Sequence, residues 1–265
     1  TSSHWSTAVG RRALYRLTSG GNNTAVGQGC AQHVTSGQYN TAMGGDALQQ
    51  TTTGQYNTAI GRVALGANTT GSYNTAVGAF AQDSITTGGS NVTVGTYNLD
   101  VATTGGYNTT MGHDTARSLT TGGNNLLLGH QAGQSGSPVT ITTGSNNICL
   151  GNNNISNAYV KVGWTTGSDQ RDKTDIQDIT TGLDFVKQLK PKSFWFTKER
   201  GSAEKHGDKK YGFLAQDILA LEGSDPVIIN NKDEDSLKYQ GSHLIPILVN
   251  AIKELSAKVA VLEAA

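Results

Sequence analysis

The chain is poor in cysteine and proline and has no long hydrophobic run. It contains 2 Cys and 4 Pro in 265 residues. Cys30 and Cys149 fall at different points of a repeat, so no disulfide framework is predicted and we expect two small, half-buried thiols. No apolar run approaches the roughly 18 residues that a membrane span needs, and the residues after Thr1 are polar, unlike a secretory signal. We therefore expect a soluble chain without membrane insertion.

Charge is scarce in the first part of the chain. Residues 1–167 carry 6 Lys/Arg and 4 Asp/Glu, whereas residues 168–265 carry 14 and 16. The density of charge thus rises about fivefold at Ser168, which indicates a domain boundary. Neither part is strongly basic, and no Lys/Arg stripe alternates with aromatic residues, so no nucleic-acid partner is expected.

Residues 1–155 consist of a repeat. Segments from "NNTAVG" to "NNLLLG" end in glycines spaced 17 residues apart: Gly27, Gly44, Gly61, Gly78, Gly95, Gly112 and Gly129. An incomplete first copy ends at Gly10, and a last copy, "NNICLG", ends at Gly151 after a five-residue insertion. A fixed period of this kind is the signature of stacked repeats.

Each repeat predicts one coil of a parallel β-solenoid. The glycines and the abundant Thr and Asn disfavour helix, and Thr24, Ala25 and Val26 alternate as in a strand. The asparagines before the strands are expected to stack in a ladder about 4.8 Å apart. This ladder comprises Asn23, Asn40, Asn57, Asn74, Asn91, Asn108, Asn125 and Asn147. Tyr39, Tyr56, Tyr73 and Tyr107 are expected to stack likewise.

A single coil cannot be stable by itself. Ordering 17 backbone residues costs roughly 17–34 kcal/mol, whereas burying a Val and a few Ala per coil returns only a few kcal/mol. We therefore expect several chains packed together, most plausibly a homotrimer. Because neighbouring coils are so alike, a slip of one whole repeat between chains preserves nearly every contact. Something outside the repeats must set the register.

The repeat resembles the "NTAVG"-type solenoid shafts of phage tail fibres and, more loosely, the head repeats of trimeric bacterial adhesins. The resemblance covers residues 1 to about 155. It implies a trimeric fibre shaft.

The last residues of the chain predict a helix with a heptad seam. Apolar residues recur at spacings of 3, 4, 3, 4 and 3, with Lys258 and Glu263 placed to pair between helices. The seam comprises Ile245, Leu248, Ile252, Leu255, Val259 and Leu262. Ser242 is a candidate cap and Pro246 falls in the first turn. The alternative is an amphipathic helix that packs on its own domain.

Four motifs upstream of and within this helix carry a second resemblance. "LDFVKQL" predicts a short helix that stops before Pro191, "SFWF" a strand, and "YGFLAQDILAL" a strand that runs into a helix, which together make a small α+β domain. In order, "SDQRDKTDI", "LKPKSFWF", "GFLAQD" and "LIPILVNAIKEL" resemble the C-terminal intramolecular chaperone and auto-protease of phage endosialidases and related tail spikes. The resemblance spans residues 168–265, and residues 156–167 are then a linker.

The second resemblance implies a function. Such domains trimerise, drive folding of the β-structured shaft that precedes them, and cut themselves off with a Ser-Lys pair. On this sequence the nucleophile is Ser168, the base is Lys173 and the scissile bond is Gly167–Ser168. Many relatives carry a His just before the "GF.AQ" stretch, whereas here the nearest candidate is His206. A His-dependent contact between chaperone and shaft is therefore in doubt.

The chemistry sets conditions on these residues. Lysine acts as a base only when burial or nearby positive charge lowers its pKa far enough. We expect the positive charge of Arg171 to lower the pKa of Lys173, and the negative charges of Asp169, Asp172 and Asp175 to raise it. Catalysis is therefore expected only after folding and assembly have desolvated Lys173. We also expect Gly167 to allow backbone angles that a side chain forbids.

The leading hypothesis is the distal part of a phage tail fibre, made in the host cytoplasm and assembled into the virion, that attaches to a host receptor or polysaccharide. No cofactor and no metal are assigned to it. One alternative is a shaft that hydrolyses polysaccharide, since Asp83 and Asp100 in adjacent coils are spaced like a retaining pair of carboxylates. Another is a trimeric surface adhesin that does not cut itself. His113 and His130 stack similarly and leave a metal site open.

Overall fold

The computed structural model describes residues 5–161, 163, 166–197, 201–231 and 237–265. The chain divides into two compact units, Thr1–Ile155 and Ser156–Ala265. Residues 162, 164 and 165 of the expected linker lie outside the described residues. In the described part of the chain, no helix has the length and apolarity to span a membrane.

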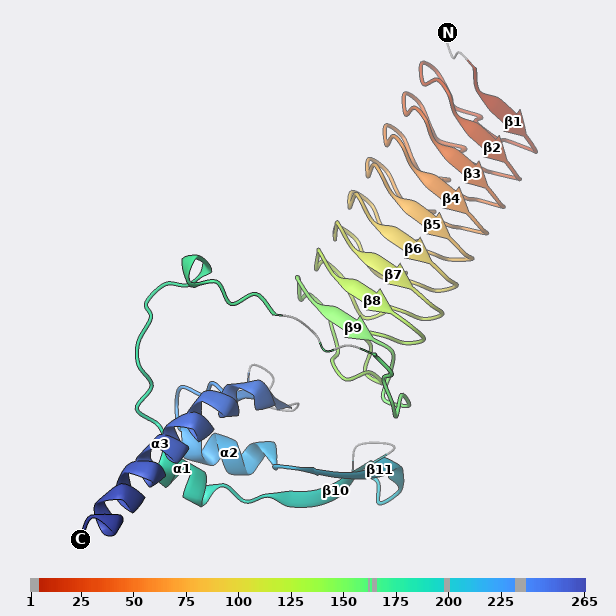
Figure 1. Ribbon diagram of the computed structural model, residues 1–265. Helices are drawn as coiled ribbons and strands as arrows, with labels where there is room; N and C mark the ends of the chain where they lie inside the picture. Colours follow the sequence, from red (N-terminus) through yellow and green to blue (C-terminus); the bar gives the residue numbers. More distant parts are fainter. Residues whose placement is uncertain (1–4, 162, 164–165, 198–200, 232–236) are drawn as a thin grey trace. The chain divides into compact units, whose positions relative to one another are not determined.

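The first unit is a parallel β-solenoid with one short strand in each coil (Figure 1). Its strands form a nine-stranded sheet in sequence order. They are β1 (Thr7–Val9), β2 (Thr24–Val26), β3 (Thr41–Met43), β4 (Thr58–Ile60), β5 (Thr75–Val77), β6 (Val92–Val94), β7 (Thr109–Met111), β8 (Leu126–Leu128) and β9 (Ile148–Leu150). Each residue pairs with its counterpart one repeat on, as Ala25 does with Ala42. The solenoid predicted from the 17-residue period is confirmed.

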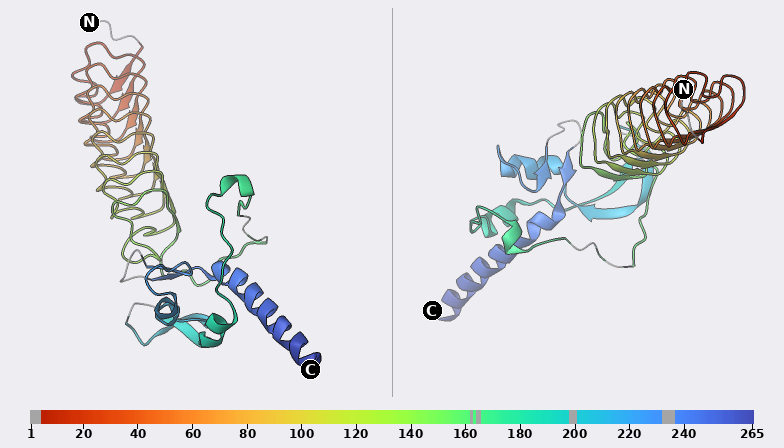
Figure 2. Two further views of the ribbon diagram at one scale, coloured as in Figure 1. Left: turned by 90° about the vertical axis from the view of Figure 1, so that its left-hand side faces the viewer. Right: turned by 90° about the horizontal axis from the view of Figure 1, so that it is seen from above.

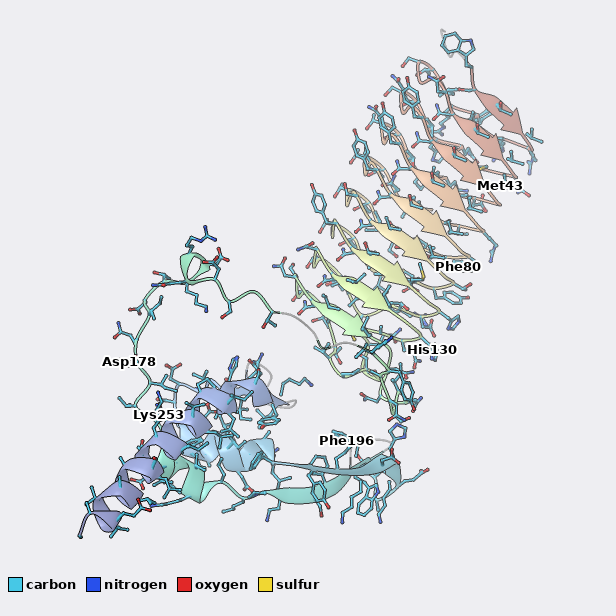
Figure 3. The ribbon with its side chains drawn as sticks, in the orientation of Figure 1. Met43, Phe80, His130, Asp178, Phe196 and Lys253 are labelled. Carbon is cyan, nitrogen blue, oxygen red and sulfur yellow. The ribbon has the colours of Figure 1, made fainter. Side chains whose placement is uncertain are left out.

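The orientation of the strand residues differs from the expectation. The central residue, such as Ala25, is fully buried, whereas the residues on either side face outward. Met43 and Ile60, which occupy the position of Val26, are 47% and 38% exposed; Figure 3 shows Met43 projecting from its coil. The strands therefore bury their central residue, and the Val26 position does not supply the buried Val expected in each coil. A three-residue strand has only one inward side chain when its ends face out.

The asparagine ladder predicted from the sequence is present. From Asn40 onward, each Asn donates its backbone N–H to Oδ1 of the Asn in the preceding coil, as Asn57 does to Asn40 at 3.0 Å; Asn23 donates to Ser6 Oγ. In every ladder residue except the last, the side-chain Nδ2 donates to a glycine carbonyl, which for Asn57 is Gly71 at 2.9 Å. The ladder is buried, and it satisfies backbone groups that no strand reaches.

The tyrosine stack is shorter than predicted. Tyr39 and Tyr56 stack with ring centroids 4.9 Å apart, and Tyr56 and Tyr73 at 5.2 Å. Ser90 occupies the next position of this row, so Tyr107 lies two coils beyond Tyr73 rather than in the stack.

The two thiols are more deeply buried than predicted. Cys30 is fully buried and Cys149 is only 4% exposed. Burial raises the pKa of the Cys30 thiol to about 11. Both sit in rows occupied mainly by alanine, so they are packing residues, and the raised pKa leaves Cys30 little thiolate character at neutral pH.

The second unit is a small α+β domain, seen with the coils from two further sides in Figure 2. Its elements are the 3₁₀ turn η1 (Gln170–Asp172), α1 (Leu183–Gln188), β10 (Lys192–Thr197), β11 (Lys205–Gly212), α2 (Ala215–Glu222), β12 (Ile229–Asn230), β13 (Lys238–Tyr239), η2 (Gly241–His243) and α3 (Leu244–Glu263). The strands pair antiparallel as β10–β11 and β12–β13. The short helix, the strand and the strand that leads into a helix predicted from the motifs correspond to α1, β10, β11 and α2.

The core of this domain forms where α2, β12 and the start of α3 meet. Ile218, Ile228, Ile229 and Leu244 are buried together. The N-terminus of α1 is capped from α3, because Glu254 Oε2 accepts the Leu183 N–H at 3.0 Å. The predicted Ser242 cap is wrong: Ser242 lies inside η2, and α3 begins at Leu244 without a side-chain cap.

Glycines at the ends of the coil strands are required for close stacking, which leads to a first prediction. Gly61 has a φ of +134°, and a Cβ there would lie 2.4 Å from the carbonyl oxygen of Gly78 in the next coil. We expect Gly61→Ala to lower the free energy of unfolding of the shaft by about 2–4 kcal/mol, through backbone strain and overpacking. Chemical denaturation monitored by circular dichroism measures the loss.

Gly45→Ala is the matched control for Gly61→Ala. Gly45 has no positive φ, and a Cβ there meets nothing within 4 Å. We expect a change within about 0.5 kcal/mol. Equal losses in the two variants would contradict the stacking seen here.

Candidate functional site

Ser168 and Lys173 lie side by side at the start of the second domain. The 3₁₀ turn η1 reverses the chain between them, and the Lys173 N–H donates to the Gln170 carbonyl at 3.1 Å. Lys173 Nζ consequently lies 2.7 Å from Ser168 Oγ and 2.9 Å from the Ser168 carbonyl oxygen. Five residues of sequence thus place an amine within hydrogen-bond distance of a hydroxyl.

An ion pair holds this turn. Asp169 caps η1 by accepting the Arg171 N–H at 2.9 Å. The Arg171 guanidinium also contacts both Asp169 oxygens, with Nη2 2.6 Å from Oδ2. These hydrogen bonds from Arg171 lower the pKa of Asp169 below its usual value and raise the pKa of Arg171. From the sequence we expect Arg171 to lower the pKa of Lys173; in the structure the hydrogen bonds of Arg171 go to Asp169.

The geometry meets one requirement of a Ser-Lys nucleophile. A nucleophilic hydroxyl needs a base within about 2.6–3.2 Å, and a lysine is that base only when it is neutral. Both residues are exposed in the single chain, where Lys173 Nζ donates to Ser168 Oγ. The pair is therefore placed for proton transfer but not desolvated.

The expectation for Gly167 is not met. This glycine has no positive φ, and a Cβ there would meet nothing within 4 Å. A side chain would fit at this position in the single chain, because neither the backbone angles nor a neighbouring group excludes it.

The predicted seam lies on an exposed face of α3. Its six residues are between 37% and 76% exposed: Ile245, Leu248, Ile252, Leu255, Val259 and Leu262. A different face of α3 packs on the domain through Ile247, Asn250 and Glu254. At 100° per residue the two faces point about 140° apart. The helix thus packs one face on its own domain and exposes a second, apolar face to solvent.

His206, the candidate for a contact with the shaft, lies in β11 opposite Phe196. Its Nε2 is buried, and within the described residues it has no hydrogen-bond partner. In the position before Gly212, Tyr211 is 85% exposed.

The shaft residues considered for glycosidase or metal chemistry lie among ion pairs that the sequence analysis did not predict. Asp100 is buried and accepts from Arg117 Nε at 3.2 Å. Burial raises the pKa values of Asp83 and Asp100 above the usual range. Arg117 also pairs with Asp114 at 3.3 Å, next to His113. A spacing of 17 residues between Asp100 and Arg117 was the signal in the sequence, since it places them in adjacent coils.

A repeat shaft followed by a small α+β domain with this serine and lysine at its start fits a tail-fibre or tail-spike protein that ends in a folding domain. Residues 168–223 match a family model described as "Chaperone of endosialidase". No curated protein and no solved structure matches the chain. The match contains Ser168 and Lys173 and ends at Gly223, before the seam helix.

The ion pair in the turn gives a second prediction, on pH. A carboxylate with a lowered pKa in the folded turn stabilises that turn above the usual Asp pKa, and this contribution is lost as pH falls through the lowered value. In Arg171→Gln we expect the pKa of Asp169 to rise towards its usual value. Carbon-detected NMR titration of the Asp169 carboxyl measures the change, with Asp175 in the same spectra as an internal reference. An Asp169 pKa that does not move on substitution would exclude the pairing.

Proposed function

We propose that this chain is a phage tail fibre whose C-terminal domain assembles three copies, templates the folding of the shaft, and then releases itself by cutting the Gly167–Ser168 bond. The observation that carries the proposal is the Ser168–Lys173 contact of 2.7 Å within a segment matched to a chaperone family. The released shaft remains in the virion and attaches to a receptor or polysaccharide on the host cell.

The cutting step uses the hydroxyl of the residue that follows the scissile bond. Ser168 Oγ attacks the Gly167 carbonyl carbon while the neutral Lys173 amine takes the hydroxyl proton. The C–N bond then breaks, Lys173 returns the proton to the Ser168 nitrogen, and Gly167 is left as an ester on Oγ. Water hydrolyses the ester, which yields a Gly167 carboxylate and a free Ser168 hydroxyl. Each chain reacts once, so no pocket for an outside substrate is needed.

Assembly supplies the control of this reaction. In the single chain the pair is exposed, so water competes for Ser168 and hydrates Lys173. Packing of further chains over the turn removes water from Lys173, which favours its neutral form. Cleavage then reports that assembly has taken place, and loss of the template makes unfolding of the shaft slow to reverse.

A third prediction tests the chemistry. Ser168→Ala and Lys173→Arg should each abolish a fragment that begins at Ser168, because Arg keeps the charge and the hydrogen bond but does not act as a base. Intact mass and N-terminal sequencing after expression measure this. Lys187→Arg, at a surface ion pair with Asp184, is the control and should cut normally.

Cleavage in Lys173→Arg at the rate of the unaltered chain would remove Lys173 from the mechanism. An unaltered chain that stays intact after it has assembled would favour the adhesin alternative.

Two exposed apolar surfaces support assembly. One is the seam of α3. The other is the outer face of the solenoid sheet, where residues flanking the buried strand centres are exposed by 38–66%: Val9, Met43, Ile60, Val92, Met111, Ile148 and Leu150. Apolar rows of this length on a single chain mark interaction surfaces.

The shaft and the matched family favour three chains, whereas the seam does not. The seam has Ile or Val at its a positions and Leu at its d positions, which in parallel coiled coils favours two strands. With fewer than three heptads, α3 does not impose this preference, and packing of three shafts sets the number.

A fourth prediction tests the seam. Ile252→Asp should block assembly, because it buries a charge at the centre of the seam. Val261→Asp is the matched control: Val261 is 70% exposed against 66% for Ile252, but lies off the seam. Analytical ultracentrifugation of the Ser168→Ala background should give trimers for Val261→Asp and monomers for Ile252→Asp. Dimers in the unaltered background would overturn the trimer, and equal assembly of both variants would overturn the seam.

A further inference from the structure

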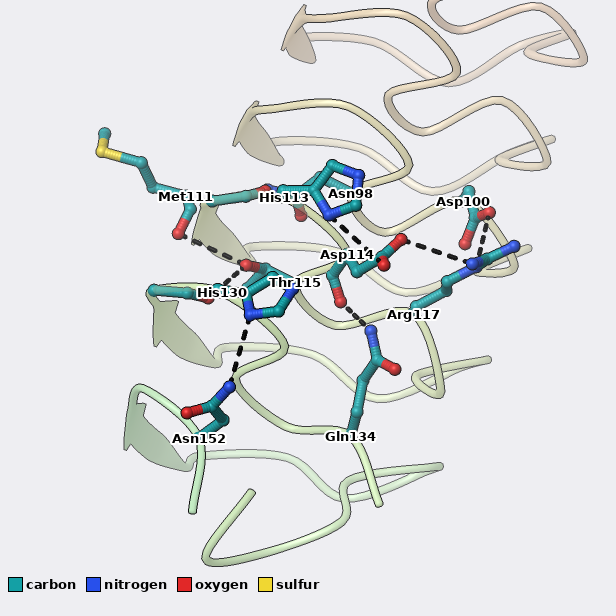
Figure 4. Close-up of polar contacts among 12 residues, drawn as sticks. Asn98, Asp100, Met111, His113, Asp114, Thr115, Arg117, His130, Gln134 and Asn152 are labelled. Atoms are coloured by element: carbon teal, nitrogen blue, oxygen red, sulfur yellow. Dashed lines mark hydrogen bonds and ion pairs between the residues drawn. The ribbon is translucent and has the colours of Figure 1, made fainter. Parts of the chain in front are cut away.

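Two histidines and an aspartate meet on the turns that follow β7 and β8 (Figure 4). His113 and His130 each follow the glycine that ends a repeat, so they occupy the same position in consecutive coils. Their ring centroids are 5.7 Å apart. Asp114 comes directly after His113, and one potential ligand atom from each of the three residues lies within 4.8 Å of the other two.

We propose that His113, Asp114 and His130 form a binding site for a divalent transition-metal ion, with Zn²⁺ as the representative ion. Imidazole nitrogen and carboxylate oxygen are ligands that Zn²⁺ prefers, and three protein ligands plus water make a common open site. With bonds of about 2.0–2.2 Å, tetrahedral ligand atoms lie roughly 3.4 Å apart. Side-chain rotation of the order of 1 Å therefore closes the set around an ion. The His113 side chain, 56% exposed, has room to make it.

Neighbouring groups already orient the three ligands. Asp114 Oδ2 lies 3.3 Å from His113 Nδ1, and Arg117 Nη1 donates to Asp114 Oδ1 at 3.3 Å. On the other histidine, the Asn152 amide lies 3.3 Å from His130 Nδ1. Outer hydrogen bonds of this kind fix the ring and carboxylate orientation in metal sites. His130 binds an ion through Nε2 when its proton is on Nδ1, which requires the Asn152 amide to turn its oxygen toward Nδ1. On His113, the nitrogen that faces the Asp114 carboxylate is Nδ1.

The local charge favours a cation. Asp83, Asp100 and Asp114 are three of the four carboxylates in residues 1–167. Arg117 is the cation among them: it pairs with Asp100 and Asp114 and lies over the Tyr97 ring at 5.2 Å. With both histidines neutral, the network carries an excess of negative charge that a divalent ion reduces.

The experiment is a Zn²⁺ titration of the full chain in the uncut Ser168→Ala background, after removal of metals with a chelator. Isothermal titration calorimetry should show one equivalent of Zn²⁺ per chain that is lost, or weakened at least tenfold, in His113→Asn and in His130→Asn. Asparagine suits this test because Asn152 holds the same position in the next coil. His33→Asn is the matched control: His33 is a shaft histidine that contacts Gln50 at 2.8 Å, and its loss should leave the titration unchanged.

A second readout separates a built site from scattered histidine binding. Co²⁺ in place of Zn²⁺ should give the strong visible absorption of a tetrahedral ion in the unaltered site and lose it in His113→Asn. Zn²⁺ should also raise the Tm of the shaft in the His33→Asn chain but not in the double variant His113→Asn/His130→Asn. Binding that survives in that double variant, or falls equally in His33→Asn, would overturn the proposal.

Discussion

The solenoid depends on hydrogen bonds that run from one coil to the next. Thr24 N–H donates to the Asn40 carbonyl at 2.8 Å and Gly27 N–H to Val9 at 2.8 Å, while the asparagine side chains join each coil to both of its neighbours. A coil by itself leaves these groups unpaired. It also contains residues in the left-handed backbone region, such as Leu48 at φ 51° and Val63 at φ 58°, each at a cost of the order of 1 kcal/mol. Only stacking offsets these costs, so the unit of stability is the stack and not the repeat.

The same uniformity makes alignment between chains ambiguous. A slip of one coil moves every side chain by one repeat and leaves its surroundings nearly unchanged, so packing energy distinguishes the registers poorly. A domain with a core of its own does not share this ambiguity. The C-terminal domain buries Ile218, Ile228 and Ile229 in a non-repeating arrangement, so a slip of one repeat has no equivalent within it. This is the physical basis on which we propose that it sets the register and is then dispensable.

The features that repeat were predictable from the sequence, and those that depend on backbone conformation were not. The 17-residue spacing fixed the pairing of strands and the asparagine ladder, because equivalent residues must stack in any parallel solenoid. The spacing does not say which way a side chain points, so it left open that Ala25 rather than Val26 is the buried residue. Leu48 in the left-handed region leaves no signal, since glycine or asparagine is the usual mark of that conformation. For the site, resemblance brought Ser168 and Lys173 together, whereas the pairing of Arg171 with Asp169 depends on the turn η1.

The shaft is not equally uniform along its length. Coils that end at Gly27, Gly44, Gly61 and Gly78 share the strand sequence Thr-Ala followed by Val, Met or Ile, whereas the later strands read VTV, TTM, LLL and ICL. The later coils also hold the Thr93–Thr110 contact at 3.1 Å and the Asp100–Arg117 pair. A slip of register between chains therefore costs the most packing free energy in the coils nearest in sequence to the C-terminal domain. Alignment set there extends into the uniform coils, because each coil is held only by its neighbours. A stack that starts in register can change register only by breaking the contacts between adjacent coils.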